Sequence, residues 1–327
     1  MSKKILVIGL GSIGKRHLKN LVTLGCQDIS IVTRSSKKIE EFESFPHYFS
    51  IDSACNANKF DVAIIATPTA NHISDLTLVL DNNIRNIYLE KPISDSMKRV
   101  SEITQRLSSV NIVVGYDLHF DPGLIFIKEL LNEDRIGRVV SFIAEVGQYL
   151  PDWREVDYRK TMSASRMKGG GVMLDLVHEF DYINWLFGPI VQVLGKNGRI
   201  GNLEIDTEDV SVSILETSSG AIGSIHLDYM QKELSRSCKV IGNEGSIIWD
   251  YSNSQVRYMT HKNPSWSVFD YSFYKRNDRF QVAMKSFLKS CDGVLDERLV
   301  SFGEAVKSLQ LVVSLKQSNN QGSVVNI

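Results

Sequence analysis

The sequence predicts an α/β protein of two domains. Residues 1–118 are expected to form a doubly wound parallel sheet, and residues 119–327 an α+β domain with an open, mainly antiparallel sheet. Three observations support this. The chain has 327 residues, 43% of them hydrophobic, which suffices for two cores. Short apolar runs alternate with helical patterns as far as Gly115. Longer runs joined by glycine-containing turns follow.

The first domain contains five apolar runs that predict parallel strands. They are apolar almost throughout instead of alternating, as is typical of strands that are covered on both faces. Helical patterns lie between them, for instance at residues 13–24 and 71–80. The predicted strands are residues 4–8, 28–33, 61–66, 86–89 and 111–114.

The second domain opens with a helical pattern at residues 122–132 and then becomes rich in strand-like runs. Turns at residues 218–220 and 242–245 contain glycine and favour antiparallel hairpins. Helical patterns return at residues 276–290 and 302–316, and residues 316–322 have the composition of a polar tail. We therefore expect helices to cover one face of the sheet. The predicted strands are residues 138–148, 191–199, 209–216, 221–229, 238–241 and 246–250.

Charge and cysteine content exclude several classes of partner. Thirty-seven basic and thirty-eight acidic side chains leave a net charge of −1, so no global field attracts the chain to nucleic acid. No apolar stretch reaches the length of a membrane span, and the run after Lys4 is too short for a signal peptide. The four cysteines lack metal or redox spacing. We therefore expect a cytoplasmic protein that binds a small molecule and no metal.

A glycine fingerprint follows the first predicted strand and opens a helix. Gly9, Gly11 and Gly14 have the Gly-x-Gly-x-x-Gly spacing of a Rossmann dinucleotide site. Such glycines supply a tight turn, close approach of backbone to pyrophosphate, and close packing of helix on strand. The helix then offers free N–H groups at Ser12 and Ile13 to the phosphates. The sequence predicts a bound nicotinamide dinucleotide; a glycine-rich turn without a ligand is the alternative.

The end of the second predicted strand bears on the choice between NADP and NAD. NAD-preferring sites have a carboxylate about 20 residues after the fingerprint, which binds the ribose hydroxyls. Here the strand ends in Thr33 and Arg34. Thr33 can hydrogen-bond a 2′-phosphate, and Arg34 can pair with it and stack on the adenine. We expect NADP to be preferred over NAD; a solvated Arg34 with relaxed selectivity is the alternative.

Three further motifs follow predicted elements in a specific order and spacing. They are Thr67-Pro68-Thr69-Ala70-Asn71-His72, then Glu90-Lys91-Pro92, then Gly169-Gly170-Gly171 leading to Asp175, His178 and Asp181. Together with the fingerprint they resemble the glucose-fructose oxidoreductase/inositol dehydrogenase (Gfo/Idh/MocA) family, over essentially the whole chain. Residues 149–164 are similar to members associated with bacterial surface-glycan and sialic-acid-like sugar pathways.

The resemblance implies where cofactor and substrate bind. The resemblance implies that Lys91 lies beside the nicotinamide and the substrate, and that the bond before Pro92 is often cis in such proteins. The alternative is that Lys91 is only a solvated lysine. The sheet of the second domain carries the substrate pocket on one face and commonly the oligomer contact on the other. We therefore expect a homo-oligomer, a dimer or a tetramer. Further cofactor contacts are expected at Thr67, Pro68, Asn71, His72, Glu90 and Lys91.

The polar residues after the three glycines are the candidates for chemistry in the second domain. Asp175, His178 and Asp181 are spaced by three residues, so we expect them on one helix face. Burying them among apolar neighbours is costly unless they have a function; a hydrogen-bonded structural face is the alternative. Family members often have four residues from the aspartate to the histidine, and this chain has three. His119 also departs from the family, whose members often carry arginine before Phe120.

Oxidation of a carbinol requires a base that accepts the hydroxyl proton. We expect His178 to act as that base, or as the acid in the reductive direction, because histidine titrates near neutrality. Lys91 is expected to orient and polarise the oxygen and to share the proton. Asp175 is expected to anchor the substrate or to partner one of the other two.

The expected substrate is a sugar, a nucleotide-sugar or a cyclitol. An aromatic face and a fork of donors suit a polyol, so Trp153, Tyr158 and Arg159 are expected substrate contacts; aromatic packing with a surface arginine is the alternative. Two other functions remain open. One is a non-catalytic NAD(P)-binding regulator, against which the retained lysine, aspartate and histidine argue. The other is a hydrolase with a tightly held dinucleotide, which would neither release nor exchange its cofactor.

Overall fold

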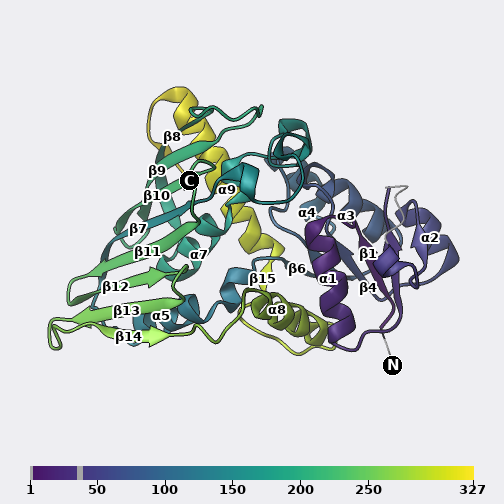
Figure 1. Cartoon of the computed structure of the whole chain (residues 1–327), viewed down its shortest axis with the longest axis horizontal. Helices are drawn as coiled ribbons and strands as arrows, with labels where there is room; N and C mark the ends of the chain where they lie inside the picture. Colours follow the sequence, from purple (N-terminus) through teal and green to yellow (C-terminus); the bar gives the residue numbers. More distant parts are fainter. Residues whose placement is uncertain (1–2, 35–39) are drawn as a thin grey trace. The chain divides into compact units, whose positions relative to one another are not determined.

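The computed structural model describes residues 3–34 and 40–327. The chain divides into two compact units, each made of two segments (Figure 1). Unit 1 comprises Met1–Asp117 and Arg276–Val306, and unit 2 comprises Leu118–Lys275 and Lys307–Ile327. The first crossing between the units falls beside residue 118, where the sequence analysis places its single boundary. A later segment returns to unit 1, which that boundary does not include.

Unit 1 is built on a seven-stranded sheet with the order β15-β6-β5-β4-β1-β2-β3. β1 to β6 pair in parallel, and only the two-residue strand β15 (Val300–Ser301) is antiparallel. Residues on both sides of β1, β2 and β4 are buried, because these strands are apolar throughout. The parallel strands are β1 (Ile5–Ile8), β2 (Ile29–Val32), β3 (His47–Tyr48), β4 (Val62–Ile65), β5 (Asn86–Leu89) and β6 (Asn111–Val114). The expected doubly wound parallel sheet is confirmed.

The helices of unit 1 include one that comes from far along the chain. Helix α8 (Arg276–Ser290) packs against α1, and its Met284 and Phe287 join Tyr88 and Val113 in the core of the parallel sheet. Periodicity shows that a helix has an apolar stripe but not which sheet the stripe covers. The other helices are α1 (Ser12–Thr23), α2 (Ile51–Ala57), α3 (His72–Asp81), α4 (Met97–Thr104) and the short η2 (Thr69–Asn71).

Unit 2 is built on a nine-stranded sheet with the order β14-β13-β12-β11-β7-β10-β9-β8-β16. Every neighbouring pair is antiparallel except β7 and β10, so the expected mainly antiparallel sheet is confirmed. The two glycine-containing turns join β9 to β10 and β11 to β12, as expected. The strands are β7 (Val139–Gly147), β8 (Ile190–Gly198), β9 (Val210–Thr217), β10 (Ile222–Asp228), β11 (Ser235–Gly242), β12 (Gly245–Asp250), β13 (Gln255–Thr260), β14 (Ser267–Asp270) and β16 (Val325–Asn326).

Helices α5 (Pro122–Asn132), α7 (His178–Phe187) and α9 (Phe302–Gln321) lie on one face of this sheet (Figure 1). Residues 316–322 are not the polar tail that the sequence suggests, because α9 continues to Gln321 and β16 then pairs with β8. The backbone N–H of Gly195 on β8 donates to the hydroxyl of Ser318, 3.1 Å away. The helix can therefore continue through polar residues here, because the backbone of the sheet forms a hydrogen bond with the Ser318 side chain.

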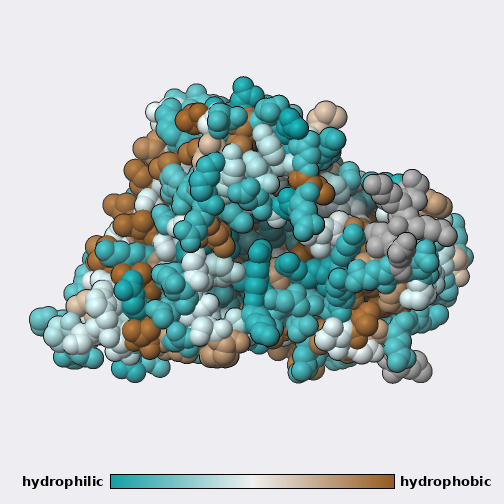
Figure 2. All heavy atoms as spheres, viewed as in Figure 1, coloured by the Kyte–Doolittle hydropathy of each residue, from teal (hydrophilic) through white to brown (hydrophobic). Residues whose placement is uncertain are grey.

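The opposite face of this sheet carries apolar side chains that no helix of residues 3–34 and 40–327 covers. Ile143, Leu194, Val212, Ile214 and Ile222 alternate along β7 to β10 with buried residues, and each is 38% to 55% exposed. Figure 2 shows hydrophobic side chains gathered along the left margin of the view, over the strands of this sheet. We call these five residues the outer face.

Candidate functional site

Four loops that carry predicted cofactor residues leave the same edge of the parallel sheet in unit 1. The loop after β1 holds the fingerprint, and the loops after β2, β4 and β5 begin near Thr33, Thr67 and Glu90. β5, β4, β1 and β2 are parallel neighbours, so their carboxyl ends lie side by side. Strand order reverses between β1 and β4, and ligands of open α/β sheets bind at such a switch point.

The three fingerprint glycines meet three different steric demands. Gly9 has a φ of +96°, and a Cβ there would lie 2.7 Å from the carbonyl oxygen of Ala66. A Cβ at Gly14 would overlap the carbonyl oxygen of Gly9, so only glycine allows this approach of helix to strand. A Cβ at Gly11 would meet no atom within 4 Å. Gly11 therefore borders open space, as a backbone that a pyrophosphate approaches must.

The N-terminus of α1 is open to an anion. Gly11 is its N-cap and offers no side-chain hydrogen bond, and the first turn, with Ser12 and Ile13, contains no acidic residue. By contrast, Ser50 caps α2 and accepts a hydrogen bond from the N–H of Ser53. An uncapped helix N-terminus presents N–H groups and a positive dipole end. The residues present thus fit a dinucleotide pyrophosphate at α1.

A carboxylate that the sequence analysis missed holds Arg34. Asp75 of α3 is fully buried, and its two oxygens accept hydrogen bonds from Thr67 Oγ1 at 2.7 Å and from Arg34 Nη2 at 3.1 Å. The Arg34 side chain is nevertheless 65% exposed. Asp75 stands three residues after His72, on the buried face of an expected helix. A carboxylate among apolar residues at that spacing was the signal available in the sequence.

His72 joins the loop after β4 to the loop after β5. Its Nδ1 lies 2.7 Å from the carbonyl oxygen of Pro92, and its Nε2 lies 2.9 Å from that of Thr67. Burial lowers the pKa of His72, while hydrogen bonds to the two carbonyls act in the opposite direction. Pro68 and Asn71 stand at the N-caps of η2 and α3. The Thr-Pro motif therefore shapes the loop beside the Glu-Lys-Pro motif.

Glu90 fixes the loop that carries Lys91 from the other side. Its Oε1 lies 2.6 Å from Nε2 of His17 on α1, and both side chains are buried. Lys91 itself is half-buried, and the bond between Lys91 and Pro92 is cis, as the resemblance implies. The Glu-Lys-Pro loop is thus attached both to the fingerprint helix and to the loop after β4.

In unit 2 the polar residues after the three glycines do not lie on one continuous helix, contrary to expectation. Helix α6 (Val172–Asp175) ends at Asp175, and α7 begins at His178. Leu176 departs from helical backbone with φ −100° and ψ 28°, so a turn separates the two helices. The single helix that the spacing by three predicts is therefore interrupted at Leu176 and Val177. Both side chains are buried.

Asp181 pairs with the residue that departs from the family pattern. Its Oδ2 lies 2.9 Å from Nε2 of His119, and the ring of Trp185 stacks on His119 with 4.2 Å between the centroids. Both members of the pair are buried. His119 and Asp181 together form a close polar contact between the start of unit 2 and α7.

Asp175 has a different partner, Tyr229, which the sequence analysis missed. The Tyr229 hydroxyl donates to Asp175 Oδ2 at 2.7 Å. Burial raises the pKa of Tyr229 well above its ordinary value, and the Asp175 charge adds to this, so the hydroxyl stays protonated; a hydrogen bond with the Ser163 side chain acts in the opposite direction. Tyr229 follows β10 with the inward alternation of Ile225 and Leu227. This alternation is visible in the sequence, but the pairing of Tyr229 with Asp175 is not.

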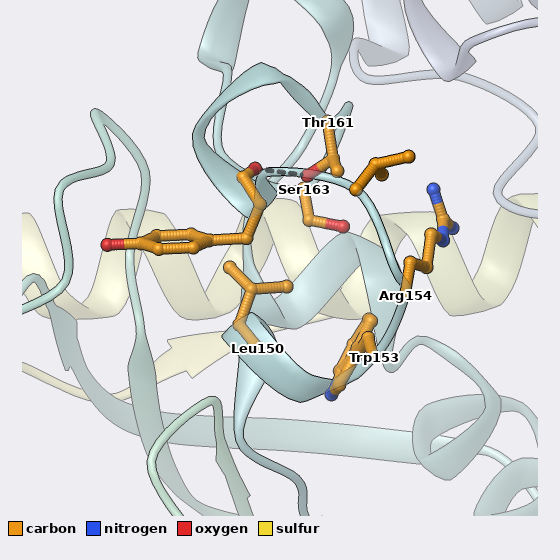
Figure 3. A pocket seen from close by; sticks show the side chains of 7 residues that line it. Leu150, Trp153, Arg154, Thr161 and Ser163 are labelled. Carbon is orange, nitrogen blue, oxygen red and sulfur yellow. Dashed lines mark hydrogen bonds between the residues drawn. The ribbon is translucent and has the colours of Figure 1, made fainter.

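A small pocket in unit 2 is formed by residues 150–163 (Figure 3). Its cavity volume is about 10 Å³, which is room for about one water molecule. The Trp153 ring meets the Tyr229 ring edge-on with 5.3 Å between the centroids, so the pocket adjoins the Asp175–Tyr229 pair. The pocket is lined by Leu150, Trp153, Arg154, Val156, Tyr158, Thr161 and Ser163.

Two of the three predicted substrate contacts, Trp153 and Tyr158, line this pocket, and Arg159 does not. The Arg159 guanidinium bonds Asp157 at 2.9 Å and Glu204 at 3.3 Å, and the Asp157 hydrogen bond raises the pKa of Arg159. The positive charge of Arg159 is therefore already matched by carboxylates of the chain.

Three observations concern partners other than the dinucleotide. In residues 3–34 and 40–327, no helix has the length and hydrophobicity needed to cross a membrane. The same residues contain no group of three His, Cys, Asp or Glu side chains that could hold a metal ion. The thiols of Cys26, Cys55, Cys238 and Cys291 are free.

Comparison with known proteins matches a family model to each of the two parts of the chain. The sequence model described as "Oxidoreductase family, NAD-binding Rossmann fold" matches residues 3–117, and that of the "GFO/IDH/MocA C-terminal domain" matches residues 125–248. Scyllo-inositol 2-dehydrogenase (NAD(+)) of Bacillus subtilis is 25% identical over 80% of this chain and 78% of its own length. Myo-inositol 2-dehydrogenase of Thermotoga maritima is 22% identical over 88% of this chain and 87% of its own.

Solved structures share the fold. The crystal structure of myo-inositol 2-dehydrogenase from Lactobacillus plantarum has a TM-score of 0.84 at 21% identity and covers 100% of both chains. Levoglucosan dehydrogenase in complex with NADH and L-sorbose has a TM-score of 0.85 at 17% identity, over 99% of this chain and 98% of that one. The family model over residues 3–117 and the parallel sheet of unit 1 confirm the expected Rossmann dinucleotide domain. The chain belongs to the Gfo/Idh/MocA family of NAD(P)-dependent oxidoreductases.

Proposed function

We propose that this protein is an NAD(P)-dependent dehydrogenase or reductase that acts on a carbinol or keto carbon of a sugar, a nucleotide-sugar or a cyclitol. The observation that supports this is the edge of the parallel sheet in unit 1 where the strands have their carboxyl ends. There α1 has an uncapped N-terminus, Gly11 borders open space, and the loop after β5 carries Lys91. Relatives that are inositol dehydrogenases support a polyol substrate. The test is to incubate the protein with NAD⁺ or NADP⁺ and a panel of inositols and sugars, and to follow reduced nicotinamide by its absorbance.

The roles of the chain's own residues follow from the chemistry. When bound, the nicotinamide would accept or donate the hydride. His178 accepts the proton of the substrate hydroxyl, or returns it in the reductive direction. Lys91 orients and polarises the same oxygen, on a loop held by His72 and Glu90. Asp175, fixed by the Tyr229 hydroxyl, anchors a neighbouring hydroxyl of the substrate.

The preference for NADP over NAD remains a proposal about Arg34 and Thr33. Among the described residues, Arg34 bonds only Asp75, through Nη2, so Nε and Nη1 remain available to a 2′-phosphate. Asp75 opposes part of the Arg34 charge, yet it also restrains the guanidinium at the end of β2. A restrained guanidinium loses less entropy when it pairs with a phosphate.

We expect Arg34→Ala to weaken NADPH binding by about ten- to a hundredfold, the value of a lost charge-assisted hydrogen bond, and NADH binding much less. Dissociation constants from fluorescence titration measure both effects. Arg85→Ala is the matched control, because Arg85 precedes β5 at the other end of the strands and donates to the carbonyl of Leu80. Equal losses for the two cofactors would remove the reason to prefer NADP.

We also propose that the protein is a homo-oligomer, a dimer or a tetramer, assembled through the outer face. Five exposed aliphatic side chains on one sheet face form an apolar surface of the kind that proteins bury against a partner. A second copy of the chain is the partner expected from symmetry, since a two-fold axis pairs such a face with itself.

Ile214→Lys should therefore shift the protein toward monomers, because it places a charge in the centre of the outer face. Light scattering at micromolar concentration measures the mass. Ile200→Lys is the control, since Ile200 is 76% exposed but lies outside these strands. A parent protein that is already a stable monomer would refute the proposal.

We also propose that the protein is located in the cytoplasm. Free cysteines favour the reducing cytoplasm. The link to surface-glycan sugars stays a prediction, because the relatives named above are inositol and levoglucosan dehydrogenases. A regulator or a hydrolase with a tightly held dinucleotide remains the second candidate; exchange of bound cofactor together with turnover of a polyol would exclude both.

A further inference from the structure

Glu90 is a buried carboxylate that faces a histidine of the fingerprint helix. Its side chain is 7% exposed, that of His17 is 0% exposed, and Glu90 Oε1 lies 2.6 Å from His17 Nε2. Within residues 3–34 and 40–327, no other side chain forms a hydrogen bond or an ion pair with the Glu90 carboxylate. A carboxylate is costly to bury unless a donor or a cation faces it. His17 is therefore what allows Glu90 to be buried here.

The surroundings of this pair leave room for the carboxylate but give the histidine no second partner. A Cβ at Gly115, which follows β6, would lie 2.8 Å from Glu90 Oε1. The His17 ring meets the Tyr88 ring edge-on, with 5.2 Å between the centroids. His17 Nδ1 is buried, and no residue that the structure describes hydrogen-bonds it. Such an atom costs about 1–3 kcal/mol, which an apolar side chain would avoid. The cost indicates that this histidine serves its contact with Glu90.

The pair stands directly before Lys91 in the chain. On the other side of Lys91, the carbonyl oxygen of Pro92 lies 2.7 Å from Nδ1 of His72. Lys91 is thus the residue between two anchored neighbours. Lysine has a compact charge on a flexible four-carbon stem, so its ammonium can turn toward a carboxylate of the adjacent residue. Glu90 would be such a carboxylate if His17 did not occupy it.

We propose that His17 is a positioning residue for the reaction: by occupying the Glu90 carboxylate, it keeps the Lys91 ammonium available to the substrate oxygen. Without His17, Glu90 pairs with Lys91 and withdraws it. The inference rests on the proposed function for the role of Lys91. It goes further in giving a task to a fully buried residue of α1, which acts through Glu90.

Kinetic constants of the whole protein, measured with saturating cofactor and a polyol that it turns over, give the first test. His17→Leu should lower kcat by about tenfold to a hundredfold. This is less than the full contribution of a general acid or base, because Lys91 is displaced and not removed. His17→Gln should retain most of the turnover, since its amide N–H can still donate to Glu90.

A second substitution separates positioning from a merely structural role. Glu90→Gln removes the charge that would capture Lys91. The double variant of His17→Leu and Glu90→Gln should therefore turn over substrate about fivefold or more faster than His17→Leu alone. A structural role predicts the reverse, because the double variant loses both members of the pair.

Lys91 itself supplies a readout that needs neither substrate nor cofactor. Reductive methylation with ¹³C-formaldehyde labels the lysines for NMR, and Lys91→Arg identifies the Lys91 signal. The chemical shift of this signal should move in His17→Leu and return toward the parent value in His17→Gln and in the double variant. Val22→Ala is the control, since Val22 lies on the same helix and is half exposed, and it should change neither the signal nor kcat.

An unchanged Lys91 signal in His17→Leu would overturn the proposal, and so would a double variant slower than His17→Leu. Thermal unfolding shows whether His17→Leu folds; if it does not, His17→Asn, whose shorter amide does not reach Glu90, takes its place in each comparison. A Lys91 signal that responds to His17 in a protein without polyol turnover would support the effect of His17 on Lys91 and count against the dehydrogenase function.

Discussion

Lys91→Ala and His178→Asn should each lower turnover by about 10²- to 10⁴-fold, the contribution typical of general acid–base catalysis. NADPH and NADH affinity should change little, because we propose that the fingerprint and α1, not these two residues, bind the pyrophosphate. The measurement is kcat on an identified polyol, with cofactor dissociation constants from fluorescence titration. Lys98→Ala on α4 and His261→Asn after β13 are controls, since both side chains are exposed.

A double variant tests whether Lys91 and His178 act as one unit. When two residues act in the same step, the double variant loses less turnover than the product of the two single losses. The limb of the pH–rate profile that a histidine near neutrality produces should move or disappear in His178→Asn. Nearly full turnover in both single variants would show that the chemistry does not depend on either residue, and would refute the roles proposed for them.

Gly11→Val should weaken NADPH and NADH binding by about a hundredfold or more, the value of two lost charge-assisted hydrogen bonds, without unfolding the protein. The reason is steric. Gly11 has an extended backbone with φ −68°, and its Cβ would meet no protein atom within 4 Å. The added side chain therefore fills only the space that the pyrophosphate needs. Fluorescence titration measures the affinity, and thermal unfolding without cofactor measures the stability.

Gly14→Ala is the matched comparison, with the opposite outcome. Its Cβ would overlap the Gly9 carbonyl oxygen, so helix and strand must separate. Overpacking of this kind costs about 1–3 kcal/mol of the free energy of unfolding, and backbone contacts relax less easily than side chains. Gly14→Ala should thus lower the unfolding temperature even without cofactor. A Gly11→Val protein that bound NADPH like the parent would show that the fingerprint is not the cofactor site.

Much of unit 1 could be predicted because its signals are local. An unbroken apolar run such as 62–65 predicts a strand buried on both faces, and glycines at fixed spacing after the first strand predict a tight turn, at which Gly9 has a positive φ. The cofactor loops could be placed together as well, since parallel strands put their carboxyl ends at one edge. These inferences need only chain connectivity and backbone sterics.

The misplaced features are those that depend on distant partners. Helix α8 covers the sheet of unit 1, and residues 316–321 extend α9 because β8 satisfies Ser318. The spacing of Asp175 and His178 fitted one helix, but a turn at Leu176 separates them. A periodic pattern describes one element and says nothing about the surface against which it packs.

By itself, therefore, the sequence determined the two sheet types, the dinucleotide fingerprint and the residue types available for proton transfer. Only the tertiary structure decided which carboxylate each polar group meets. Asp75 reaches Arg34 across 41 positions, Tyr229 reaches Asp175 across 54, and Arg159 meets Glu204 whereas Arg154 meets no carboxylate. Such pairings set the charge available to a ligand. They arise from strand register and helix packing, which bring together residues whose separation along the chain carries no signal.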